Sequence, residues 1–451
     1  MSAHPVSTYA AALILTAIAV TPVSAADLGG NCCADLEERI AELEATTARK
    51  GNRKVSLTIS GMINETLMFW DDGFERNTYQ LTNETKRGRF KFAGNAKITD
   101  DWSAGYVLEL GPRGARQDRA SQTTDTGSGS NTVDIRYSYW TVKSKSLGTL
   151  GMGLQPQASD GVTEVTTANT DHFARPAPTQ QFGDSGGGFF LRLNDGTLTS
   201  LRFGNIVTQG FNGTPGEGHR LNAVRYDTPT MAGFTASASW GEDDFWDLAL
   251  RYAGELGGFK LAAAIGYVDW TDGSATNPRG CARATTGSDV DCQEIGLSGS
   301  IMHLATGLFV TGGYGHRKDH SLANVYAGAA GIDDTQDFYF VQSGIEQKWL
   351  SIGKTTIFGE YWRENAGPGL TTNGTQLNAA PLGAGARVSA AEITMWGVGL
   401  NQTVAEGVDM YVSYRHVDAD VFTSATGGRT GETKVEIEPF QYVTAGAAIK
   451  F

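Results

Sequence analysis

The chain ends on Tyr442-Val-Thr-Ala-Gly-Ala-Ala-Ile-Lys-Phe451, and this stretch decides the fold. Side chains of a β-strand alternate between two faces, so the apolar positions Phe451, Ile449, Ala447, Ala445 and Val443 predict a strand with one apolar face. A strand at the end of a chain must be paired on both sides or leave an open edge. In a closed barrel the last strand pairs with the first, and its apolar face can meet lipid.

The composition agrees with a large barrel and argues against other classes of protein. Among 451 residues there are 58 Gly and only 12 Pro, and 40% are hydrophobic, which is too few for a bundle of membrane helices. Gly, small polar residues and aromatic residues suit a barrel with a wet interior and an apolar exterior. The formal net charge of -13 argues against nucleic acid as a partner, because a phosphate backbone needs cations.

The first 26 residues read as a signal peptide. Tyr9 to Val20 is an apolar run that is too short to span a membrane as a helix, and Val23 to Ala26 offers a small-residue cleavage site. Met1 to Thr8 contains no Lys or Arg, which is atypical of a signal peptide and leaves the true start codon open. We expect the chain to be exported.

Residues 27–54 form the predicted periplasmic coiled-coil segment, which holds a single short helix. Cys33, Leu36, Ile40 and Leu43 are spaced by 3, 4 and 3 residues, which is the spacing of core positions in a coiled coil. Such a short helix is marginal alone, so several copies are expected to associate. The alternative is a solvated linker, and whether Cys32 or Cys33 cross-links subunits stays open.

The other two cysteines predict a disulfide. Cys281 and Cys292 flank a loop-like stretch, and export would place them in an oxidising compartment where a bridge persists. Two free thiols are the alternative.

Residues 55–451 read as about sixteen strands of a closed antiparallel transmembrane β-barrel, an all-β fold. The expected strands cover 55–70, 87–98, 102–111, 132–143, 148–156, 221–228, 233–241, 245–254, 258–270, 292–302, 305–316, 336–347, 354–363, 390–402, 407–419 and 435–451. An even number places both ends of the barrel on one side, which we expect to be the periplasm. Short connections such as Thr99 to Asp101 alternate with long ones such as Asp71 to Lys86, as in outer-membrane barrels.

Aromatic residues lie near the expected strand ends. Phe69, Trp70, Trp240, Trp246, Trp270 and Trp362 fall at outer ends, and Trp102 and Trp349 fall at inner turns. This distribution predicts two girdles at the membrane interfaces. The alternative is that aromatic residues simply favour strands.

Three further stretches carry a family likeness. They are Cys32-Cys-Ala-Asp-Leu-Glu-Glu-Arg-Ile-Ala-Glu-Leu-Glu-Ala-Thr46 with Lys54 to Gly61, Val224-Arg-Tyr-Asp-Thr-Pro229 with Gly233-Phe234, and Ser239-Trp-Gly-Glu-Asp-Asp244. With these stretches and its terminal strand, the chain resembles porins of the alphaproteobacterial outer membrane.

The resemblance implies a homotrimer of water-filled barrels in the bacterial outer membrane, each passing small hydrophilic solutes passively and without a cofactor. It implies contact with membrane lipid and lipopolysaccharide, and a barrel-assembly machinery that reads Phe451 as its signal.

The longest connection, residues 157–220, is rich in Gly, Thr, Asp and Asn, and long loops of this kind usually carry function. It resembles the inward-folding third loop of trimeric porins, which implies that it narrows the channel. Its carboxylates are Asp160, Glu164, Asp171, Asp184 and Asp195.

Cations are expected on the wall that faces this loop. Arg87, Arg89, Lys91 and Lys97 share one face of segment 87–98, opposite Phe90 and Phe92. Because the apolar face should meet lipid, the cations should point into the lumen. The same alternation predicts that Arg136, Arg225, Arg251 and Arg415 point inward, with Tyr137 and Tyr139 pointing outward. Cations on the wall and carboxylates on the loop would create a transverse field.

Signatures of an enzyme are missing from the sequence. His316 and His320 have a four-residue spacing, but Arg317-Lys-Asp319 between them reads as a turn, not as a metal-binding helix. We therefore expect a general diffusion porin, with no metal and no catalytic residue. The alternatives are a substrate-selective channel for an anion or a sugar, and a surface or structural anchor protein.

Overall fold

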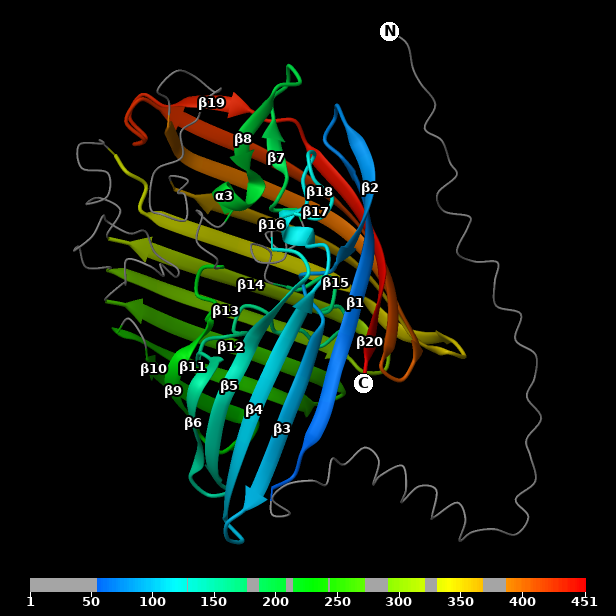
Figure 1. Ribbon diagram of the computed structural model, residues 1–451, viewed down its shortest axis with the longest axis vertical. Coiled ribbons are helices and arrows are strands. Elements are labelled where there is room, and N and C mark those ends of the chain that lie inside the picture. The colour runs from blue at the N-terminus through cyan, green and yellow to red at the C-terminus, as the bar shows by residue number, and fades with distance from the viewer. Residues whose placement is uncertain are drawn as a thin grey trace. The chain divides into compact units, whose positions relative to one another are not determined.

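Alternating side chains build a closed antiparallel barrel in the computed structural model, which describes residues 55–127, 129–176, 186–207, 214–241, 244–271, 291–320, 331–367 and 387–451 (Figure 1). The expected signal peptide, residues 1–26, lies outside the described residues, and so does the expected coiled coil within 27–54. Among the described residues, no helix is both long enough and apolar enough to cross a membrane.

In the part of the chain that the structure describes, eighteen strand segments make the barrel wall. They are β1 (Thr58–Asp71), β2 (Arg76–Thr82), β3 (Arg89–Lys97), β4 (Trp102–Arg113), β5 (Thr132–Ser144), β6 (Gly148–Pro156), β9 (Arg220–Asp227), β10 (Phe234–Gly241), β11 (Phe245–Leu256), β12 (Phe259–Trp270), β13 (Cys292–His303), β14 (Leu308–Asp319), β15 (Thr335–Leu350), β16 (Gly353–Ala366), β17 (Arg387–Ala405), β18 (Val408–Ser424), β19 (Thr433–Glu436) and β20 (Phe440–Lys450). The other elements among the described residues are η1 (Gln117–Arg119), the hairpin of β7 (Phe190–Arg192) and β8 (Leu198–Arg202), and α3 (Phe203–Val207).

These eighteen segments form sixteen barrel strands, as predicted. Both β2 and β3 pair with β1, at successive levels, so together they make one strand that is interrupted at residues 83–88. Likewise β19 and β20 both pair with β18 and are interrupted at residues 437–439. Every other strand pairs with the next along the barrel.

The first and last strands close the barrel, as the terminal decapeptide predicts. Met62 lies opposite Lys450, and the register continues along both strands. Beyond the ladder, the Gly61 amide donates to the Phe451 carbonyl oxygen at 2.8 Å, and the Phe451 amide donates back at 3.1 Å. The chain therefore pairs backbone groups to its last residue.

One face of each strand is apolar and exposed, and this face is the outer wall. On β11, Leu248 and Leu250 are exposed, whereas the alternate residues Asp247 and Ala249 are buried. Ile449 on β20 and Phe451, which directly follows β20, are exposed as expected.

Three of the expected girdle residues face the other way. Phe69, Trp240, Trp246, Trp102 and Trp349 are exposed on the outer wall, in keeping with girdles at the interfaces. Trp70, Trp270 and Trp362 were predicted for the same girdle, and this was wrong: each is at most 4% exposed and faces the interior. Phe69 and Trp70 are neighbours on β1, so one of them has to point inward.

The predicted long loop from Asp71 to Lys86 is also wrong, because it contains strand β2. A tight turn joins β1 to β2, in which the Asp72 carboxylate accepts hydrogen bonds from the amides of Phe74 and Glu75 at 3.2 and 2.8 Å. Gly73 has a φ of 87°, which only glycine adopts readily.

The closure can be tested by a disulfide across the seam. Leu67 and Ala445 lie directly opposite each other on β1 and β20. Because opposed Cβ atoms in an antiparallel pair are about 5 Å apart, we expect Leu67→Cys with Ala445→Cys to cross-link under oxidation. The background carries Cys32→Ser and Cys33→Ser. Cross-linking is read as a shift in electrophoretic mobility of the refolded protein that a reductant reverses.

The matched control is Leu67→Cys with Ile449→Cys. Ile449 lies opposite Ile63, four residues away along β1, so this pair should stay reduced. Equal cross-linking of both pairs would contradict the register.

Candidate functional site

The described residues between β6 and β9, which are 157–176, 186–207 and 214–219, lie against the inner face of the barrel. Side chains of the wall accept hydrogen bonds from the backbone of this loop. Asp247 accepts from the Ser159 amide at 2.7 Å, and Glu346 accepts from the Asn169 amide at 2.9 Å. Ser298 accepts from the Val165 amide at 3.0 Å and donates back to the loop. Since these wall residues alternate with exposed apolar ones, the loop runs inside the barrel from β11 to β15.

Arginines of the wall bind the carbonyl oxygens of the same loop. Arg225 donates to Gln157 at 2.9 Å, and Arg251 donates to Ala158 and Asp160 at 2.6 and 2.7 Å. Both residues point inward, as predicted. Their guanidinium groups hold the loop in place, a task that alternation alone does not reveal.

Arg415 points inward too, but it is buried beneath the loop. It pairs with Glu360 at 2.7 Å and donates to the Phe173 carbonyl oxygen at 3.2 Å, and the residue is only 1% exposed. The Phe173 ring stacks on Tyr411 with centroids 4.5 Å apart. Arg415 therefore anchors the loop at Phe173 and does not line the aqueous path.

The interrupted strand of β2 and β3 contacts the neighbouring loop residues Asp171 and His172. Lys86, in the 83–88 interruption, forms an ion pair with Asp171. The next residue, His172, accepts a hydrogen bond from the Asn64 side chain on its carbonyl oxygen at 2.8 Å. Burial acts to raise the pKa of Asp171, but contact with His172 and the charge of Lys86 outweigh it and hold the pKa well below its ordinary value. Asp171 is thus an anion that fastens the loop to the wall.

Two arginines of the β3–β5 wall share one carboxylate. Arg136 pairs with Glu109 at 2.7 Å, and Arg89 lies 3.8 Å from the same carboxylate. The Arg89 side chain is 20% exposed. Lys91 follows on the same face of β3 and is partly exposed. The wall here carries an excess of positive charge.

Tyr137 and Tyr139 also face the lumen, so their predicted outward orientation is wrong. The pairing of β4 with β5 shifts register between Glu109 and Leu110, where Arg136 is the extra residue of a β-bulge. A bulge resets the alternation, so Arg136 and Tyr137 point to the same side. The two tyrosine rings are 6.2 Å apart.

Carboxylates of the loop lie near another set of cations, which includes Arg175 of the loop and Arg220 at the start of β9. Burial raises the pKa of Asp160, while the charges of Arg220 and Arg175 oppose the rise. Burial likewise raises the pKa of Glu164, which pairs with Arg175 at 2.9 Å. Glu217 lies deeper: burial and the charges of Glu164 and Asp160 raise its pKa well above the ordinary value.

Other predicted pore residues lie away from this region. Arg87 belongs to the 83–88 interruption, is 3% exposed, and pairs with Asp134 at 2.5 Å. Lys97 lies at the short-turn end of β3, where it pairs with the exposed Asp100. Both residues pair with carboxylates that lie outside the loop.

Asp195 does not lie among the loop carboxylates either. It is in the turn between β7 and β8, where it is exposed and accepts a hydrogen bond from the Thr197 amide at 2.8 Å. Asp184 lies outside the described residues, as does Cys281. Cys292 is buried at the start of β13 and is disulfide-bonded, so its pairing with Cys281 stays a prediction.

The sequence did not single out Arg175, Glu217 or Arg220. Arg220 is the last residue of the expected loop and the first of β9, and no local pattern marks it. Arg175 and Glu217 lie in irregular stretches where no alternation exists to assign a direction. Within the described residues, no group of three or more His, Cys, Asp or Glu side chains could hold a metal ion.

Solved structures share the fold at low sequence identity. An anion-selective porin from Comamonas acidovorans superposes with a TM-score of 0.53 at 14% identity, over 88% of this chain and 100% of that chain. The trimer form of OmpT from Vibrio cholerae superposes with a TM-score of 0.50 at 14% identity, over 88% and 99%. None of the curated proteins matches the chain.

These superpositions show the fold alone, whereas the family of the chain follows from its sequence. The model of the Gram-negative porins matches residues 10–421, which is most of the chain. It agrees with a sixteen-strand barrel whose outer face is apolar and whose lumen holds a long loop. The chain belongs to the Gram-negative porin family, the diffusion channels of the outer membrane.

Proposed function

We propose that small hydrophilic solutes and ions cross this porin between the loop 157–219 and the wall of β3–β5, by passive diffusion and without a chemical step. The observation that carries the proposal is the separation of charge across this part of the lumen. Arg89 and Arg136 share a single carboxylate on the wall, and Asp160 and Glu164 lie on the loop. Oppositely charged walls orient water and dipolar solutes, which favours polar over apolar cargo.

A preference for anions is the second candidate. Three arginines favour this preference, because the charges of Arg89, Arg136 and Arg220 lie near one another. The single carboxylate of Glu109 pairs with the first two. The structure from Comamonas acidovorans is described as anion-selective. The net charge of -13 opposes this preference at long range, although salt screens charges that lie far from the path.

Assembly into a homotrimer is part of the proposal. OmpT of Vibrio cholerae is described in a trimer form. A coiled coil within residues 27–54 would join three barrels on the periplasmic side, and Phe451 would serve as the signal for barrel assembly. An alphaproteobacterial source and contacts with lipopolysaccharide complete the proposal.

Charge removal should move ion selectivity in opposite directions on the two sides of the lumen. Arg89→Gln removes a cation and should lower the anion-to-cation permeability ratio by about twofold or more, whereas Asp160→Asn should raise it. The measurement is the reversal potential in a salt gradient across a planar bilayer. Lys97→Gln, at the exposed turn, is the matched control and should leave the ratio at the wild-type value. If Arg89→Gln and Lys97→Gln behave alike, the path does not pass Arg89.

Selectivity should also depend on pH. Asp160 and Glu164 have raised pKa values, so on acidification they lose charge before ordinary carboxylates do. The arginines keep their charge, so the anion preference should rise on acidification, at a pH above that at which ordinary carboxylates titrate. Reversal potentials at each pH measure this change. The double variant Asp160→Asn, Glu164→Gln should abolish most of the pH dependence, and an unchanged dependence would rule out these two groups.

A further inference from the structure

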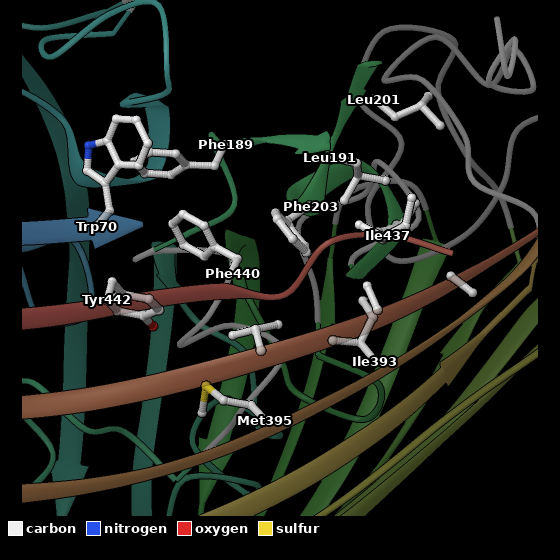
Figure 2. Packing of buried hydrophobic residues seen from close by; sticks show 14 of the residues in the cluster. Trp70, Phe189, Leu191, Leu201, Phe203, Ile393, Met395, Ile437, Phe440 and Tyr442 are labelled. Carbon is white, nitrogen blue, oxygen red and sulfur yellow. The ribbon is translucent and has the colours of Figure 1, made fainter. Parts of the chain in front are cut away.

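An apolar cluster fills part of the lumen, although the interior of a water-filled channel should be polar. On the wall it takes inward side chains of β1, β15–β18 and β20, among them Trp70, Phe340, Met395 and Phe440, each at most 6% exposed. Figure 2 shows Phe189, Leu191, Phe203 and the wall residues pointing toward one another. Water is therefore excluded from this side of the barrel.

The loop supplies the other half of this cluster through residues 186–207, here called the plug. Phe189, Leu191, Leu201, Phe203 and Ile206 are each at most 2% exposed. Aromatic rings from the two halves are in direct contact. Phe189 lies 4.7 Å from Phe440 between ring centroids, and Trp70 lies 5.1 Å from Phe189.

Polar contacts bind the edge of the plug to the β1–β2 turn and to the interruption between β19 and β20. Arg192 pairs with Asp72 at 2.8 Å and with Glu75 at 2.9 Å, both in the β1–β2 turn. Burial acts to raise the pKa of Asp72, but hydrogen bonds from the Glu75 amide, Gln122 and Arg192 outweigh it, so the pKa lies below its ordinary value. The Glu438 amide, in the interruption between β19 and β20, donates to the Arg192 carbonyl oxygen at 2.8 Å.

The connection between β4 and β5 also binds the plug, through Gln122. The Gln122 side chain donates to the Phe190 carbonyl oxygen and accepts from the Phe190 amide, both at 3.0 Å. The interruption between β19 and β20 adds a backbone bridge from Ile437 to Leu193. Three separate segments of the outer rim thus fix the plug, which fits a permanent part of the barrel.

We propose that the plug closes the lumen along β15–β18 and β20, so that solutes pass only along the facing wall, past Arg89, Lys91 and Tyr137. The wall under the plug is buried, whereas the Arg89 and Glu164 side chains are each 20% exposed and Asp171 is 37% exposed. The path is therefore off-centre, and the plug helps to set its width. This proposal rests on the channel function above.

Thiol accessibility tests the proposal in the full-length, membrane-reconstituted protein. In a background of Cys32→Ser and Cys33→Ser, Met395→Cys lies under the plug and Lys91→Cys lies on the open wall. A membrane-impermeant maleimide should label Lys91→Cys readily and Met395→Cys at least about tenfold more slowly, because a buried thiol is shielded from the reagent. Equal labelling rates would overturn the plug whether or not the protein conducts.

Removal of the β7–β8 hairpin is the second test. The Phe203 amide donates to the Phe189 carbonyl oxygen at 2.9 Å, so a short glycine linker can replace residues 190–202 without moving the ends. Single-channel conductance should rise by about twofold as the lumen widens, larger neutral polymers should enter, and Met395→Cys should become reactive.

Retained heat-modifiable migration on a gel shows that the shortened barrel has folded. A folded variant with wild-type conductance and an unreactive Met395→Cys would overturn the proposal. If the variant does not fold, the labelling of the full-length protein decides alone. A full-length chain that shows the predicted labelling contrast but no conductance would contradict the channel function and leave the plug in place.

Discussion

Backbone hydrogen bonding in lipid is the constraint on which the rest of the structure depends. A strand in hydrocarbon cannot leave its amide and carbonyl groups unpaired, so the sheet has to close on itself. Here the closure extends to the final residue, where Gly61 and Phe451 exchange two hydrogen bonds. Once the wall is closed, inside and outside are fixed by alternation. The position of the loop and the path that it leaves open then depend on what the inward side chains bind.

Inward polar residues bind the loop mainly through its backbone. Carboxylates such as Asp247 and Glu346 accept from amide groups, and Arg225 and Arg251 donate to carbonyl oxygens. A loop inside a barrel has no ladder of its own, so the wall must satisfy its buried backbone groups. Most charged wall residues are therefore occupied by hydrogen bonds to the loop. Only those that stay partly exposed, such as Arg89, can act on a solute.

Much of the wall could be predicted from the sequence, because strand alternation is local. The sixteen strands, the closure at Phe451 and the inward direction of Arg225, Arg251 and Arg415 follow from it. Tyr137 and Tyr139 could not be assigned, because a single β-bulge at Arg136 reverses every face that follows, and its position depends on pairing with β4. The burial of Arg415 depends on Phe173, a residue 242 positions away along the chain.

Where the plug contacts the wall, the alternation of apolar and polar residues does not distinguish the lumen face of a strand from its lipid face. On β15, Phe338 and Phe340 point inward while Tyr339 and Val341 point outward, so both faces are apolar and neither is marked as lumen. An aromatic side chain gains about 1.5–3 kcal/mol when it is removed from water. Inward aromatic residues on β15, β16 and β20 therefore require an apolar partner inside the barrel. Residues 186–207 supply it, which explains how a loop of polar composition carries Phe189, Leu191 and Phe203 into a channel. An apolar inner face on a porin strand is consequently a sign of a filled lumen, not of a misassigned register.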